Sequence, residues 1–101
     1  MGGKREPRSG KEVSTLERGL VERGLLGPLR ALCKAYSVTL DDVLAGINST
    51  RIVRGRDACA HLLLGKGFST TEAGKLLGMH HTSIIAARQR FEKRDMGRLI
   101  E

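Results

Sequence analysis

Aromatic residues are scarce in this chain. Tryptophan is absent, and phenylalanine and tyrosine together make up 3% of the 101 residues. The apolar core must therefore be built from Leu, Ile, Val and Ala. β-Sandwiches and barrels depend on β-branched and aromatic residues, so this composition favours packed helices. We expect an all-α fold, and the length suits one domain of about 100–150 residues.

Cysteines are also few, and no metal-binding pattern is present. Cys33 and Cys59 form no C-x-x-C pair and have no histidine beside them at ligand spacing. We expect both to be small buried residues, as free cysteines often are. His80 and His81 are adjacent on a predicted helix, where side chains diverge by about 100° and do not readily share a metal. The sequence thus predicts no metal site and no cofactor.

Long apolar runs, phosphate loops and catalytic sets are missing as well. No run approaches the length of a bilayer span, and the N-terminus has no apolar signal segment. Residues 65–70, GKGFST, contain letters of a phosphate loop, but the G-x-x-x-x-G-K-[ST] order is absent and no strand is predicted before them. No Ser/His/Asp or Cys/His set occurs at plausible spacing. We therefore expect no enzyme, no nucleotide binding, no membrane contact and a cytoplasmic location.

Positive charge is what the chain has in excess. The net charge is +7, and it is concentrated in two parts of the sequence. Residues 1–11 carry a net +3, residues 12–47 a net −1 and residues 48–101 a net +5. A polyanion is the natural partner, and nucleic acid is favoured because no segment pairs a basic face with a Trp- and Phe-rich apolar face.

The N-terminal part is predicted to contain a basic arm and one helix. Residues 1–11 are rich in Gly, Pro and charge, so we expect a disordered arm. Residues 12–26 are expected to hold a helix at about 15–25, because Ser14 and Glu17 have the spacing of a capping box.

The domain proper is predicted at residues 27–101, as a multi-helix bundle. Pro28 suits the first position of a helix, and Thr39 resembles an N-cap followed by two aspartates. Residues 46–56 are interpreted as a polar, basic connection, with a longer helix starting at about Val53. Residues 95–101 are expected to add one further turn.

Residues 69–92 have the pattern of a helix-turn-helix. Ser69 and Glu72 form a second capping box, Gly78 ends that helix, and a helix over about residues 80–94 follows. In such a motif the first helix braces across phosphates while the start of the second enters the major groove. The predicted base-reading residues are His80, His81, Thr82 and Ser83. The predicted phosphate contacts around them are Ser69, Thr70, Lys75, Arg88 and Arg90.

The simpler alternative is that residues 69–92 are two packed helices joined by a glycine turn. That reading leaves unexplained why polar residues gather at the start of the second helix while its apolar stripe stays uninterrupted. We therefore favour duplex DNA as the partner.

Four segments give the chain a family resemblance. They are A-Y-S-V-T-L-D-D-V-L at 35–44, R-G-R at 54–56, S-T-T-E-A-G-K-L-L-G at 69–78 and H-T-S-I-I at 81–85. From Leu29 to Glu92 the chain resembles the C-terminal DNA-binding domain (domain IV) of the bacterial chromosomal replication initiator DnaA. The resemblance implies a fold of the Trp-repressor type that binds short DnaA boxes as a monomer. It also implies a role in replication initiation or transcription, in the bacterial nucleoid.

The resemblance also implies roles for single residues. His81 and Thr82 match the residues that read bases, and Ser83 matches a nearby DNA contact. A basic loop matching residues 48–56 reaches the minor groove and adjacent phosphates in that family, which brings in Asn48, Arg51, Arg54 and Arg56. The chain departs from the family pattern at four positions: His80 replaces an acidic residue, Asn48 a loop arginine, Gly55 a proline and Asp57 a glutamine.

Two other functions remain open at this stage. The sequence lacks the ATPase module of DnaA, so we expect a stand-alone DNA-binding domain. It could instead be a dimeric transcription regulator that pairs through the helix at 15–25. It could also be a protein-interaction adaptor that has lost DNA binding. The small apolar Ala86 and Ala87 and the apolar face of Leu16, Leu20 and Val21 would allow this.

Overall fold

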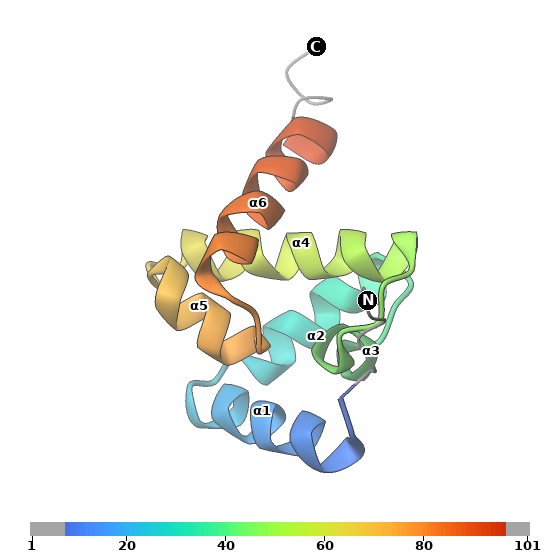
Figure 1. The fold of residues 1–101 in the computed structure, drawn as a ribbon, viewed down its shortest axis with the longest axis vertical. Coiled ribbons are helices and arrows are strands. Elements are labelled where there is room, and N and C mark those ends of the chain that lie inside the picture. Colours follow the sequence, from blue (N-terminus) through green and yellow to red (C-terminus); the bar gives the residue numbers. More distant parts are fainter. Residues whose placement is uncertain (1–7, 97–101) are drawn as a thin grey trace, which may run out of the picture.

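The computed structural model describes residues 8–96, and within that range every regular element is a helix. α4 runs across the middle of the molecule and packs against four other helices, while α6 crosses it and extends beyond it (Figure 1). The predicted all-α fold is confirmed. The elements are α1 (Gly10–Glu22), α2 (Leu26–Ala35), α3 (Leu40–Ala45), α4 (Thr50–Gly65), α5 (Thr70–Leu77), α6 (His81–Phe91) and a π-helical turn, η1 (Glu92–Met96).

α1 begins five residues earlier than predicted. The capping box is formed by Ser9 and Glu12, whose spacing equals that of Ser14 and Glu17. The Ser9 hydroxyl accepts the Glu12 N–H at 3.3 Å, and the Glu12 carboxylate accepts the Ser9 N–H at 3.0 Å. Starting at Gly10 brings Val13 into the buried face of the helix beside Leu20, and this extra apolar burial favours the longer helix.

Part of the predicted disordered arm is therefore ordered. The Arg8 N–H donates to the Ala45 carbonyl at 2.8 Å, and the Arg8 guanidinium donates to the carbonyls of Leu44, at 3.1 Å, and Gly78. The prediction is wrong for residues 8–11 because these bonds and the Ser9 cap hold the segment against α3 and α5. The remainder of the arm, residues 1–7, lies outside the described residues, as do residues 97–101 of the predicted last turn.

The predicted start of α3 is confirmed, whereas that of α2 is wrong. Pro28 is the third residue of α2, not the first, and Leu25 stands at the N-cap without a side-chain hydrogen bond. Thr39 caps α3 as predicted, because its hydroxyl accepts the Asp42 N–H at 3.1 Å.

The basic connection predicted at 46–56 is mostly helix. Ser49 caps α4 by accepting the Ile52 N–H at 3.3 Å, so the helix starts at Thr50. Ile52 is buried, and Gly55 lies so close to the connection between α2 and α3 that an added Cβ would be 2.8 Å from a methyl of Val38. Packing against α2 and this connection extends the helix into a segment whose charges predict a loop.

α4 supplies much of the core. Cys59, Ala60 and Leu63 on α4 are fully buried and pack with leucines of the surrounding helices. Cys33 on α2 is buried as well, and its Sγ lies 3.7 Å from that of Cys59. Both cysteines are free, so the prediction of small buried residues is confirmed.

The end of the described chain is held to α2 by a polar contact. The Tyr36 hydroxyl, at the end of α2, donates a hydrogen bond to the carboxylate of Asp95 in η1. Burial and this acidic neighbour raise the pKa of Tyr36 to about 12. The neutral phenol is therefore favoured in the folded state.

The hydrogen bond between Tyr36 and Asp95 predicts how the stability of the fold depends on pH. Its contribution to the free energy of unfolding is fully present below the ordinary tyrosine pKa of about 10, and it is lost as the pH rises through about 12. Because the chain has one tyrosine and no tryptophan, tyrosinate absorbance follows this group alone. Asp95→Asn should shift the midpoint down toward that of the urea-unfolded chain. A native midpoint equal to the unfolded one would contradict the contact.

Candidate nucleic-acid interface

α6 presents one buried and one exposed side. Successive residues are about 100° apart on a helix, so Ile84, Ala87 and Phe91 share a face. Ile84 and Ala87 are fully buried there, and Phe91 is half-buried and stacks on the ring of His61 at 4.4 Å. The opposite face, which we call the outer stripe of α6, consists of Thr82, Ile85, Ala86 and Gln89. The stripe is mostly exposed, with Ala86 half-buried.

The turn before α6 is short and fixed on both sides. The Ser69–Glu72 capping box that starts α5 is present as predicted, and Gly78 ends α5 with a left-handed backbone, φ 71°. The Met79 N–H donates to the Gly74 carbonyl at 2.7 Å, so the turn lies directly against α5. Three residues, 78–80, thus separate the two helices, a geometry compatible with the predicted helix-turn-helix.

His80 caps α6, a role that the sequence did not predict for it. Its Nδ1 accepts the Thr82 N–H at 3.3 Å and lies 2.8 Å from the Thr82 hydroxyl. The His81 ring lies 4.3 Å from the His80 ring. His80 is therefore placed to orient Thr82, with His81, Thr82 and Ser83 exposed beside it.

A hollow of about 410 Å³ lies along one flank of α6. It gathers residues from four parts of the chain, and five predicted DNA contacts are among them. Arg8, which the sequence analysis had placed in a disordered arm, also lines it. The polar and charged residues that line the hollow are Arg8, Asn48, Arg56, His80, Ser83 and Arg90, and none of the lining residues is acidic.

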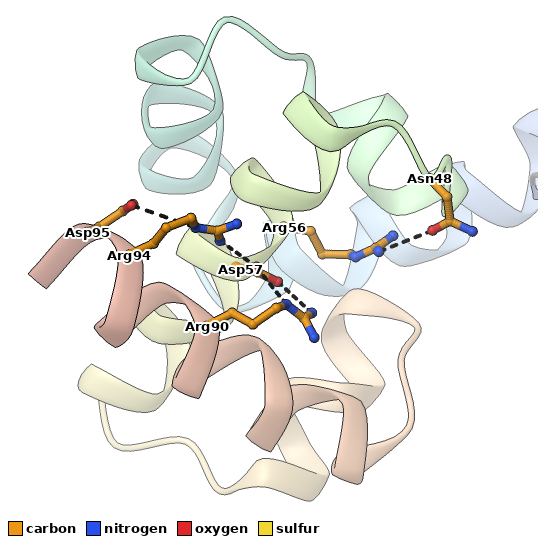
Figure 2. Close-up of polar contacts among 6 residues, drawn as sticks. All are labelled: Asn48, Arg56, Asp57, Arg90, Arg94 and Asp95. Atoms are coloured by element: carbon orange, nitrogen blue, oxygen red, sulfur yellow. Dashed lines mark hydrogen bonds and ion pairs between the residues drawn. The ribbon is translucent and has the colours of Figure 1, made fainter. Parts of the chain in front are cut away.

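Arg56 is a half-buried cation of this hollow. Its Nη2 donates to the Asn48 side-chain oxygen at 3.2 Å (Figure 2), while its Nε is buried and has no hydrogen-bond partner among the described residues. Burial lowers the pKa of Arg56, and the neighbouring charges of Arg90 and Arg8 act in the same direction against the opposing effect of Asp57. Asn48 thus orients Arg56 rather than standing free at the surface.

Arg90 is bound to a buried carboxylate that the sequence analysis did not identify. Asp57 on α4 is 0% exposed, and it accepts hydrogen bonds from Arg90 Nε at 3.0 Å and Nη2 at 2.9 Å. Arg94 Nη2 donates to the same carboxylate at 2.8 Å (Figure 2). These bonds raise the pKa of Arg90. Arg90, predicted as a phosphate contact, therefore joins α6 to α4, and 47% of its side chain remains exposed at the edge of the hollow.

Arg51 and Arg54 are not brought to this hollow. They lie on the first turns of α4, turned away from Arg56, and line a separate hollow with Tyr36 and Asp95. The predicted 48–56 contacts thus fall into two groups that line different hollows.

The remaining predicted contacts lie on α5 and on the other flank of α6. The Ser69 hydroxyl is used in the capping box, where it accepts the Glu72 N–H at 3.1 Å. Thr70 is half-buried and Lys75 is exposed. Arg88 is exposed on the flank opposite the hollow, 3.9 Å from Glu92. These residues surround α6 but do not form one cluster.

Residues 8–96 contain neither a metal-binding cluster nor a membrane span. No group of three or more His, Cys, Asp or Glu side chains there is placed to hold a metal ion. None of the helices in this range is both long and apolar enough to span a bilayer.

Comparison with known proteins identifies no relative: no family model, no curated protein and no solved structure matches the chain.

Proposed function

We propose that this chain binds duplex DNA with sequence preference, inserting α6 into the major groove while α5 lies across the phosphates. The observation that carries the proposal is the outer stripe of α6. It is mostly exposed, its first residue Thr82 lies between the exposed His81 and Ser83, and it runs beside a hollow lined by three arginines.

The geometry suits groove entry. The major groove is about 12 Å wide and admits one helix. Short polar side chains at the start of that helix can reach base edges, and His80 holds the Thr82 backbone N–H and lies within hydrogen-bond distance of its hydroxyl. Arg88 on one flank and the hollow on the other place positive charge on both sides of the stripe, where the two phosphate backbones would run.

The finer assignment follows the resemblance to DnaA domain IV. We propose a site related to the DnaA box and a role in regulating replication initiation or transcription in the bacterial nucleoid. Asn48 binds Arg56 where that family has a free loop arginine, so the preferred sequence is expected to differ from the standard box at the positions read by that loop.

The packing of α1 gives little support to the two alternatives. The apolar face of α1 was their candidate interaction surface, but Leu20 is 0% exposed and Leu16 packs against the core of the same chain. Only Val21 remains, with 56% of its surface exposed. One exposed valine is too little apolar surface for a stable dimer interface.

Fluorescence anisotropy tests the proposal. The chain is titrated onto a duplex with a DnaA box, a scrambled duplex and duplexes selected from a random library, each at two salt concentrations. We expect one sequence to be preferred over the scrambled duplex at the higher salt, by about tenfold or more. His81→Ala with Thr82→Ala should remove the preference while leaving salt-dependent binding.

Two outcomes would count against it. Equal, steeply salt-dependent binding to every duplex would limit the function to non-specific DNA binding. No binding at low salt would favour the adaptor hypothesis over DNA binding.

A further inference from the structure

The hollow beside α6 holds more positive charge than the groups bonded to its arginines can balance. Arg90 is paired with Asp57, but Arg56 bonds only to the neutral Asn48, and Arg8 only to backbone carbonyls. A guanidinium removed from water is costly unless it is paired and hydrogen-bonded. Among the described residues, two arginines of the hollow therefore form no ion pair with a carboxylate.

Arg8 supplies the second of these charges, and it comes from the N-terminal segment rather than from α5 or α6. Its guanidinium lies at the end of α5, where an added Cβ on Gly78 would be 3.0 Å from Arg8 Cζ. It bonds to carbonyls at the C-terminal ends of α3 and α5, so it offsets the negative ends of both helix dipoles. Those carbonyls would otherwise repel an anion from the hollow.

The hollow also has neutral donors suited to an oxyanion. The Ser83 hydroxyl, on the first turn of α6, is exposed and lines it, and so does the Asn48 side chain. Arginine and hydroxyl donors around a phosphate form charge-assisted hydrogen bonds, which are stronger than neutral ones.

We propose that this hollow is a clamp for one backbone phosphate of bound duplex DNA, with Arg8 and Arg56 as the charged donors and Ser83 as a neutral one. The proposal rests on the proposed function, because the hollow lies on the flank of α6 that would face one phosphate backbone. It adds a contact from the N-terminal segment, which precedes the stretch that resembles DnaA domain IV.

A phosphate scan tests the clamp. Single phosphates of the preferred duplex are replaced by uncharged methylphosphonates, and affinity is measured for the wild-type chain, Arg8→Gln and Arg18→Gln. Arg18 is an exposed arginine of α1 that does not line the hollow, so its substitution removes the same charge elsewhere. We expect one phosphate whose neutralisation weakens wild-type binding by about tenfold, the size of one charge-assisted hydrogen bond.

In Arg8→Gln that penalty should shrink to about twofold, and the salt slope should fall by about one. The penalties at all other phosphates, and every penalty in Arg18→Gln, should stay as in the wild type. Because Arg8 also holds α3 and α5 together, Ser83→Ala is measured in parallel. Its side chain is exposed, and its loss should reduce the penalty at the same phosphate.

Three results would contradict the clamp, and they can be told apart. If Arg8→Gln weakens binding while every phosphate keeps its wild-type penalty, Arg8 is purely structural and the clamp is wrong. A wild-type scan without one dominant phosphate would also overturn the clamp, while duplex binding itself would stand. Failure of the wild-type chain to bind any duplex would remove the proposed function and the clamp together.

Discussion

Replacing both Arg90 and Arg94 with alanine is expected to destabilise the chain by about 3 kcal/mol, because it leaves the Asp57 carboxylate buried without a cation. Asp57 is 0% exposed, and both arginines donate to it within 3.0 Å. Removing one side of a buried ion pair costs about 3–5 kcal/mol. We expect the lower end of that range because the arginine side chains are 47% and 28% exposed and water can reach the site.

A third substitution separates this effect from loss of packing. Adding Asp57→Ala to the double variant removes the stranded charge, so the triple variant should be more stable than the double variant by about 1–2 kcal/mol. The matched control is Arg88→Ala with Lys93→Ala, which removes two charges from exposed positions and should change stability by no more than about 0.5 kcal/mol. Urea unfolding followed by circular dichroism measures all four. If the triple variant is no more stable than the double one, the buried Asp57 carboxylate does not destabilise the fold when the two arginines are removed, and this explanation is wrong.

Gly74→Ala is the second change with a large expected effect. A Cβ there would lie 2.5 Å from the Met79 carbonyl oxygen and 3.5 Å from the His81 nitrogen. Both are backbone atoms of the segment that leads into α6, so relief requires the turn itself to move. Overpacking of this kind costs about 1–3 kcal/mol, and here it exceeds the gain of about 1 kcal/mol that alanine has over glycine in a helix.

We therefore expect Gly74→Ala to lower the free energy of unfolding by about 2 kcal/mol and to weaken duplex binding. Binding is affected because the start of α6 shifts relative to α5. Gly19→Ala is the control, since Gly19 lies within α1 and has open space where the Cβ would go. It should stabilise the chain by about 0.5–1 kcal/mol. An equal increase in the free energy of unfolding in both variants would contradict the close packing of the turn against α5.

The sequence predicted helices best where a cap and an apolar face agree. Ser69 with Glu72 and Thr39 with its two aspartates marked true helix starts. The same logic failed at α1 because Ser9 and Ser14 each have a glutamate three residues later. Spacing alone cannot choose between them, and burial of Val13 does.

The loop predicted before α4 shows a second kind of failure. Three arginines and a glycine made residues 51–56 resemble a polar connection, yet Ser49 caps a helix there. Gly55 lowers helix propensity, but it also allows α4 to approach Val38 closely. That gain depends on a tertiary contact and cannot be derived from local propensity.

For the candidate site, the polar start and the uninterrupted apolar stripe of α6 followed from the sequence, whereas the long-range pairing of its arginines did not. The bond between Arg90 and Asp57 spans 33 residues of sequence, and that between Arg8 and Gly78 spans 70. One signal for Asp57 was present: the acid directly precedes the apolar run Ala58–Cys59–Ala60, which the structure buries. A carboxylate in such a position needs a cation, but nothing local identifies which one.

Backbone amide NMR of the intact chain, with and without the preferred duplex, tests most directly that DNA binds along α6. We predict the largest chemical-shift changes at residues 80–90 and around Arg8, Asn48 and Arg56, with the outer surfaces of α1 and α2 nearly unchanged. Changes centred on α1 and α2, with α6 unaffected, would contradict the account.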